Sequence, residues 1–293
     1  MWIAITLAAA CFQIARTSEQ HRLREVLSVA EAGYVRFVYA FPIAAALSST
    51  WFISQGSAPQ PTITFWLWVF VAGVSQIAAT MALLHSFRLR DFAVGTIYSK
   101  TEVLFVSAAS VVLLGESIGW LGWIGAVICL AGVASLASRG AIGSILSAGL
   151  DPAAWYGTAA ALGFALAAVG IRGASSGLEG STLDRAALTL TAMLGIQTVV
   201  QGVAIVRSPT SSLRRVATAW RQASRVALLS LMGSAAWALA LSLENAAKVR
   251  TLGQVEIVLA FAIGIAVHGE THHRKEYLAG AATITGIVLI VVS

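Results

Sequence analysis

The chain has 293 residues, of which 58% are hydrophobic and only 11% are charged. Soluble domains carry about 25% charged residues, so this composition excludes a soluble globular protein and indicates an integral membrane protein. The net charge of +6 comes from 19 Lys and Arg residues scattered over short loops, which is typical of polytopic membrane proteins. We therefore expect a lipid bilayer around the chain and no nucleic-acid partner.

Ten apolar stretches approach the ~20 residues that a helix needs to cross a bilayer. In chain order they are residues 2–18, 29–52, 65–86, 93–114, 120–137, 154–174, 183–206, 225–243, 247–267 and 277–292. The first stretch contains Gln13 and Arg16, whose polar groups we expect to face the bundle interior rather than lipid. The longest loop, 207–224, is strongly basic. These stretches predict an all-α fold with ten transmembrane helices.

The sequence nearly repeats itself at a shift of 154 residues. Segment 100–104, KTEVL, with LGE at 114–116, recurs as segment 254–258, QVEIV, with HGE at 268–270. The two repeats, residues 1–143 and 152–293, hold five stretches each. Because five is odd, the second repeat enters the membrane in the opposite direction, which predicts two inverted five-helix repeats with a solute site near the bilayer midplane.

Glu102 and Glu256 occupy matched positions in the two repeats, near the middle of apolar stretches. An ionisable group at the centre of a membrane helix costs ~2.5 kcal/mol or more, so such groups usually have a function. In one interpretation the two carboxylates form a proton or cation site coupled to the solute, because a carboxyl group removed from water can exchange protons near neutral pH. In the other, each is a protonated or hydrogen-bonded strut between helices.

Two further polar residues accompany the carboxylates. Lys100 lies two residues before Glu102, so their side chains point about 200° apart on a helix and cannot pair directly. Lys100 either reaches a solute carboxylate or a backbone carbonyl in the cavity, or extends toward a membrane interface. Gln254 is its counterpart in the second repeat.

Five more side chains are candidates for the solute cavity. Gln13, Gln76 and His85 could orient a polar ligand by hydrogen bonds, or could bond to a neighbouring helix. Tyr98 and Trp237 could stack on a ring or a cation, with packing in the helix core as the alternative.

The sequence shows no sign of an enzyme. It has no His-Glu-x-x-His, Gly-x-Ser-x-Gly or Walker A motif. His268, His272 and His273 lie near Glu270, but their spacing fits no known metal site. We expect no catalysis, cofactor or metal, and a process driven by an ion or solute gradient.

The ends of both repeats resemble the EamA-like ten-helix family of the drug/metabolite transporter superfamily. The resemblance rests on TEVLF at 101–105, LLGE at 113–116, LAGV at 130–133, QVE at 254–256, TGI at 285–287 and the Arg36-Phe37 dipeptide. It covers essentially the whole chain and implies a basket of ten helices that exports small metabolites or drugs. It also implies that the first, third and fourth helices of each repeat line the cavity while the fifth braces them.

The chain departs from that family directly after each carboxylate. Many relatives have Pro there, whereas this chain has Val103 and Ile257. We therefore expect the fourth and ninth helices to be less kinked than in those relatives.

The combined observations predict a secondary-active transporter of an amino-acid-like or drug-like solute, working by alternating access around the two carboxylates. We expect an exporter in the bacterial inner membrane, as a monomer or homodimer, with a proton or another ion as the coupling partner. The alternative is a membrane receptor, a scaffold or a passive pore. A scaffold needs no buried carboxylates, and a pore needs a continuous polar stripe.

The distribution of positive charge predicts the orientation. The loops after odd-numbered stretches carry thirteen Lys and Arg residues, whereas those after even-numbered stretches carry only Arg172, Arg185, Lys248 and Arg250. Because Lys and Arg near helix ends are retained in the cytoplasm, the odd loops should lie inside. With ten spans, both termini would then face outward.

Overall fold

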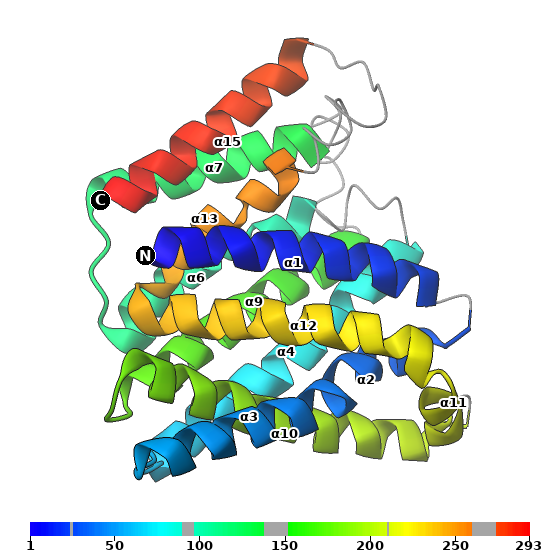
Figure 1. Cartoon of the computed structure of the whole chain (residues 1–293). Helices are drawn as coiled ribbons and strands as arrows, with labels where there is room; N and C mark the ends of the chain where they lie inside the picture. The colour runs from blue at the N-terminus through cyan, green and yellow to red at the C-terminus, as the bar shows by residue number, and fades with distance from the viewer. Residues whose placement is uncertain (24–25, 90–96, 138–151, 210, 260–273) are drawn as a thin grey trace. The chain divides into compact units, whose positions relative to one another are not determined.

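The regular secondary structure of the described residues is helical. The computed structural model describes residues 1–23, 26–89, 97–137, 152–209, 211–259 and 274–293. In these segments every regular element is a helix (Figure 1), which confirms the all-α prediction.

The helices are long and apolar enough for a membrane protein. Seven described helices meet the length and hydropathy of a membrane span, and Trp2–Arg16 and Trp120–Leu136 are shorter apolar helices. Together they correspond to nine of the ten predicted stretches. The remaining stretch, 247–267, continues past residue 259 and lies partly outside the described residues.

The structure divides into two compact units that do not coincide with the two predicted repeats. Unit 1 contains Met1–Val74 and Gly170–Leu243, and unit 2 contains Ser75–Val169 and Glu244–Ser293. Each unit therefore takes one segment from each half of the sequence. The repeats 1–143 and 152–293 remain a prediction from the sequence.

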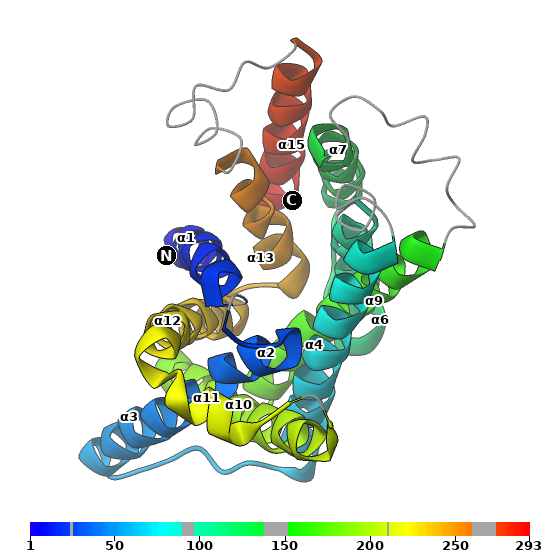
Figure 2. The same cartoon turned by 90° about the vertical axis from the view of Figure 1, so that its right-hand side faces the viewer.

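Unit 1 is built largely from six helices, together with the first part of α4 and the last part of α9. They are α1 (Trp2–Leu23), α2 (Val29–Val38), α3 (Ala40–Gln55), α10 (Thr182–Arg207), α11 (Leu213–Thr218) and α12 (Trp220–Leu243). Helices α1 and α12 lie side by side (Figures 1 and 2) and pack over most of their length. Trp51 of α3 donates a 2.7 Å hydrogen bond to Asp184 of α10, which fixes one end of that helix pair.

The predicted stretch 29–52 is one membrane-spanning segment, Ala30–Gln55, in which a turn at Tyr39 divides α2 from α3. Pro42 lies in the first turn of α3 and has no N–H to bond to the carbonyl of Val38. A proline is tolerated in the first turn of a helix but not in its interior, so the helix restarts at Ala40.

The start of α2 is held by a buried carboxylate. Ser28 and Glu31 form a capping box, in which each side chain bonds to the other residue's backbone N–H. Glu31 also accepts hydrogen bonds from the backbone N–H of Ser212 (2.6 Å) and from Nε of Arg215 (2.9 Å). The predicted basic loop is therefore partly ordered, since it contains the short helix α11 and is tied to α2.

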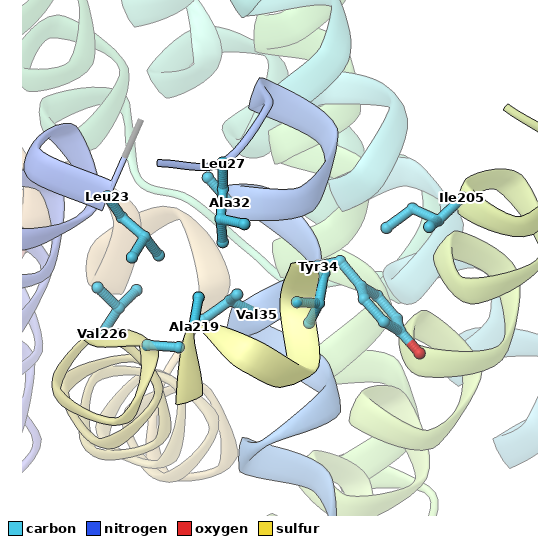
Figure 3. Close-up of a cluster of buried hydrophobic side chains, with 10 residues drawn as sticks. Leu23, Leu27, Ala32, Tyr34, Val35, Ile205, Ala219 and Val226 are labelled. Carbon is cyan, nitrogen blue, oxygen red and sulfur yellow. The ribbon is translucent and has the colours of Figure 1, made fainter. Parts of the chain in front are cut away.

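An apolar cluster lies beside this contact (Figure 3). It joins the end of α1 with α2, α10, α11 and the start of α12, through ten buried side chains. Tyr34 and Val35 of α2 lie between Ile205 on one side and Ala219 on the other (Figure 3). The cluster fixes the position of α2 within unit 1.

Unit 2 is organised around the closely packed helices α7 (Trp120–Ala137) and α15 (Arg274–Val292), which run side by side (Figures 1 and 2). Gly125 and Gly286 make this approach possible: a Cβ on Gly125 would lie 2.7 Å from the carbonyl oxygen of Gly286, and one on Gly286 would overlap the backbone N of Cys129. Small residues allow such backbone contact where lipid removes the hydrophobic driving force. The other described helices of unit 2 are α6 (Glu102–Leu114), α13 (Ala246–Gly253) and parts of α4 (Ile63–Leu89) and α9 (Pro152–Ser176).

Candidate functional site

Both carboxylates follow an interruption in their helices. Residues 97–100 are helical, Thr101 is a turn, and α6 begins at Glu102. In the second repeat α13 ends at Gly253, Gln254 is a turn, and residues 255–259 are helical again. At each break an N–H bonds three residues back, from Thr101 to Tyr98 and from Gln254 to Thr251. A one-residue turn thus lies directly before Glu102 and two residues before Glu256, although no proline follows either carboxylate.

Each carboxylate pairs with a cation from the other repeat. Lys100 Nζ donates to Glu256 Oε1 over 2.5 Å. Arg250 Nε donates to Glu102 Oε1 over 2.6 Å. Lys100 therefore pairs with Glu256 rather than with Glu102, in keeping with the two-residue spacing noted in the sequence. All four residues belong to unit 2. We call them the charge cluster.

The charge cluster is largely removed from solvent and electrically balanced. The side chain of Glu102 is 4% exposed, and those of Lys100, Arg250 and Glu256 are 15–17% exposed. The charge of Glu256 also acts on Arg250, so the two ion pairs are coupled rather than independent. Two carboxylates and two cations give zero net charge when all are ionised, which makes the cluster tolerable in an apolar bundle.

Gln254 adds an unsatisfied acceptor beside the cluster. The residue is 2% exposed, and its Nε2 bonds to the backbone oxygen of Arg250 over 3.4 Å. Its Oε1 is buried and has no hydrogen-bond donor among the described residues. A buried amide oxygen without a donor costs about 1–3 kcal/mol, so this atom favours a donor supplied from outside the chain.

This arrangement can exchange partners. Protonation of either carboxylate removes its negative charge and leaves a cation available to a negatively charged group. Conversely, a cationic ligand could take the place of Lys100 or Arg250 on a carboxylate. Because the pairs are coupled, a change at one carboxylate alters the field at the other.

The remaining candidates are divided between the units. In unit 1, Trp237 Nε1 donates a 3.2 Å hydrogen bond to Gln13 Oε1, so these two residues are joined to each other across α1 and α12. Gln76, His85 and Tyr98 belong to unit 2. Gln76 is partly buried in α4, whereas His85 is exposed and contacts Tyr156 in a tilted arrangement, with ring centroids 4.4 Å apart and an interplanar angle of 52°. Tyr98 packs against Ile97 and Ala153, next to Lys100 in the chain.

Arg250 is the site residue that the sequence analysis missed. It was counted as a loop charge, although it falls within the predicted stretch 247–267. The repeat gave no signal, because its counterpart at the 154-residue shift is Thr96, a neutral residue. The signal that could have identified Arg250 is its position inside an apolar stretch, only six residues before Glu256.

The histidine-rich segment is not part of the described structure. His268, Glu270, His272 and His273 lie in 260–273, outside the described residues. Among the described residues there is no group of three His, Cys, Asp or Glu side chains that could hold a metal ion.

Comparisons with known proteins support the family resemblance. The model of the EamA-like transporter family matches residues 1–138. This match, over slightly less than half of the chain, confirms the resemblance seen in the sequence motifs. Among curated proteins no sequence matches the chain.

Solved structures support the fold. Twenty-eight chains match. One of them, described as "Crystal structure of protein", has a TM-score of 0.68 and 16% sequence identity, and the match covers 98% of this chain and 95% of that chain. At this identity the likeness shows the fold alone.

Proposed function

We propose that this chain, whose first 138 residues match the EamA-like transporter family, is a secondary-active exporter of a small amino-acid-like or drug-like metabolite. Glu102 and Glu256 are its coupling carboxylates. The observation that carries the proposal is the charge cluster, in which each carboxylate is bound to a cation of the other repeat.

A purely structural role gives little reason to keep four charges in an apolar bundle. Replacing a buried ion pair by apolar side chains of similar size is often neutral or even stabilising. A transporter does gain from such pairs, because it must exchange an internal partner for a ligand or proton during each cycle. Ionisable groups within membrane helices commonly mark proton relays and solute pathways for this reason.

The charge cluster suggests how a proton could be coupled to the solute. With both carboxylates ionised, the pairs Lys100–Glu256 and Arg250–Glu102 are closed. A proton that binds one carboxylate opens its pair, and the released cation receives a polar group of the solute. Loss of the proton on the other side of the membrane closes the pair again and releases the solute. Proton and solute thus cross together, and export follows when the outward solute gradient exceeds the opposing proton gradient. Export is assigned from the family resemblance.

A thermal-shift screen followed by a flux assay tests this proposal. Purified protein is heated with a library of amino acids, other small metabolites and drug-like compounds, and a compound that binds the folded state raises the unfolding midpoint. The radiolabelled compound should then enter proteoliposomes saturably and exchange with unlabelled compound inside. Flux that stays proportional to concentration would indicate a passive pore, and binding without flux would indicate a receptor.

We also propose that the chain lies in the bacterial inner membrane with both termini outside. Arg250 is paired with Glu102 and Arg16 lies within α1, so neither is a loop charge, and twelve Lys and Arg residues in odd loops now stand against three in even loops. A fusion of alkaline phosphatase to Ser293 should therefore be active, and a fluorescent protein at the same position should stay dark. A bright fluorescent fusion with an inactive phosphatase fusion would reverse the orientation.

A further inference from the structure

Unit 1 contains a buried cation that the proposed transport cycle does not use. Arg36 of α2 is only 9% exposed. Its Nε is buried without a hydrogen-bond acceptor, and no carboxylate of the described residues pairs with it. Its guanidinium lies over the ring of the adjacent Phe37, whose centroid is 5.3 Å from Cζ. An aromatic ring supplies no net negative charge, so the guanidinium remains uncompensated.

A second cation lies near Arg36. Gln20 of α1 donates a 3.0 Å hydrogen bond to the backbone oxygen of Ala32 in α2. Arg16 precedes Gln20 by one helical turn and lies on the same face of α1. Arg36 follows Ala32 by one turn and lies on the same face of α2. The positive charge of Arg16 acts on Arg36.

The acidic side chain nearest to Arg36 along α2 is already committed. Glu31 is fully buried and accepts hydrogen bonds from Ser28, Ser212 and Arg215. It cannot serve Arg36 without giving up those bonds. A buried charge without a partner is strongly unfavourable, and a neighbouring like charge adds to the penalty. A negative group from outside the chain would compensate the charge of Arg36.

We propose that Arg36 binds an anionic group, a carboxylate or a phosphate, in unit 1. The planar guanidinium presents its N–H donors in a fork that matches two oxygens of such a group. The anion comes either from a water-soluble compound or from the headgroup of an anionic lipid. This inference does not depend on the proposed transport, because it concerns binding to unit 1 and not movement of a solute.

Thermal unfolding of the full chain in detergent, after removal of lipid, tests the site. Inorganic phosphate and acetate are titrated against sodium chloride at equal ionic strength. In the wild-type protein at least one of the two anions should raise the unfolding midpoint by a few degrees and then saturate, whereas chloride should not. Arg36→Gln should abolish the rise. Arg36→Lys should keep a smaller one, since an ammonium group binds the anion through a single point.

A matched control and a lipid arm separate the outcomes. Arg225→Gln removes an exposed arginine of the same unit and should leave the rise unchanged. In the lipid arm, the protein is placed in nanodiscs of phosphatidylcholine with or without phosphatidylglycerol. A rise with phosphatidylglycerol that requires Arg36, without a response to soluble anions, assigns the site to a lipid headgroup.

The variant without any added anion gives a second measurement. If Arg36 is uncompensated, Arg36→Gln should unfold at a higher temperature than wild type in chloride alone, because a buried charge has been removed. A lower midpoint for this variant, together with no Arg36-dependent response to phosphate, acetate or phosphatidylglycerol, would overturn the site. Neither result bears on whether the protein transports a solute, so failure here and failure of the proposed function are distinguishable.

Discussion

Glu102→Gln is expected to abolish solute uptake driven by a pH gradient while leaving solute exchange at equal pH largely intact. The amide has nearly the shape of the carboxyl group but cannot bind and release a proton. It can still accept a hydrogen bond from Arg250, and the charge of Glu256 continues to act on that arginine. The fold should therefore survive, and the lost property should be the coupling itself.

The measurement uses proteoliposomes with the solute found in the thermal-shift screen, with and without an imposed pH gradient. Glu256→Gln should give the same result, because the carboxylates occupy matched positions in two coupled pairs. Glu179→Gln is the control, since Glu179 is an exposed acid outside the charge cluster. Full gradient-driven uptake by the double variant Glu102→Gln and Glu256→Gln would exclude a proton role for both carboxylates.

The helices were largely predictable from sequence, because a membrane span has a fixed length and an apolar composition. The stretch 120–137 coincides with α7, and the stretch 183–206 differs from α10 by one residue at each end. The stretch 29–52 corresponds to the span Ala30–Gln55, but the turn at Tyr39 inside it was not predicted, although Pro42 is the signal for it. Hydropathy sums over a window and does not register a single absent N–H, so it locates the span and not the turn within it.

The partners in the site were harder to predict than its carboxylates. Glu102 and Glu256 were found because they repeat at a fixed shift and interrupt apolar sequence. The pairing of Arg250 with Glu102 depends on the contact between α13 and α6, which are far apart in the chain. Arg250 also breaks the repeat, since Thr96 stands at its matched position. A repeat identifies residues that both halves need and overlooks those that only one half has.

The Arg250–Glu102 pair should also dominate the stability of unit 2. Arg250→Met removes the cation and leaves the buried carboxylate of Glu102 unpaired, which is expected to lower the free energy of unfolding by about 2–4 kcal/mol. This range allows for the partial exposure of the arginine side chain, 17%. The double variant Arg250→Met with Glu102→Gln should recover most of the loss, because the unpaired charge is gone.

The free energy of unfolding is measured by denaturant titration in detergent for the wild type, both single variants and the double variant. A double-mutant cycle then gives the coupling energy between the two positions. Arg214→Met, which removes an exposed arginine of α11, serves as the control and should change stability by less than about 0.5 kcal/mol. If the two single effects simply add in the double variant, then the 2.6 Å ion pair contributes nothing to the fold and the charge cluster consists of independent groups. A large coupling energy between positions 250 and 102 would show that the ion pair stabilises unit 2. Together with the loss of gradient-driven uptake in Glu102→Gln, it would mean that the same pair both stabilises unit 2 and opens during transport.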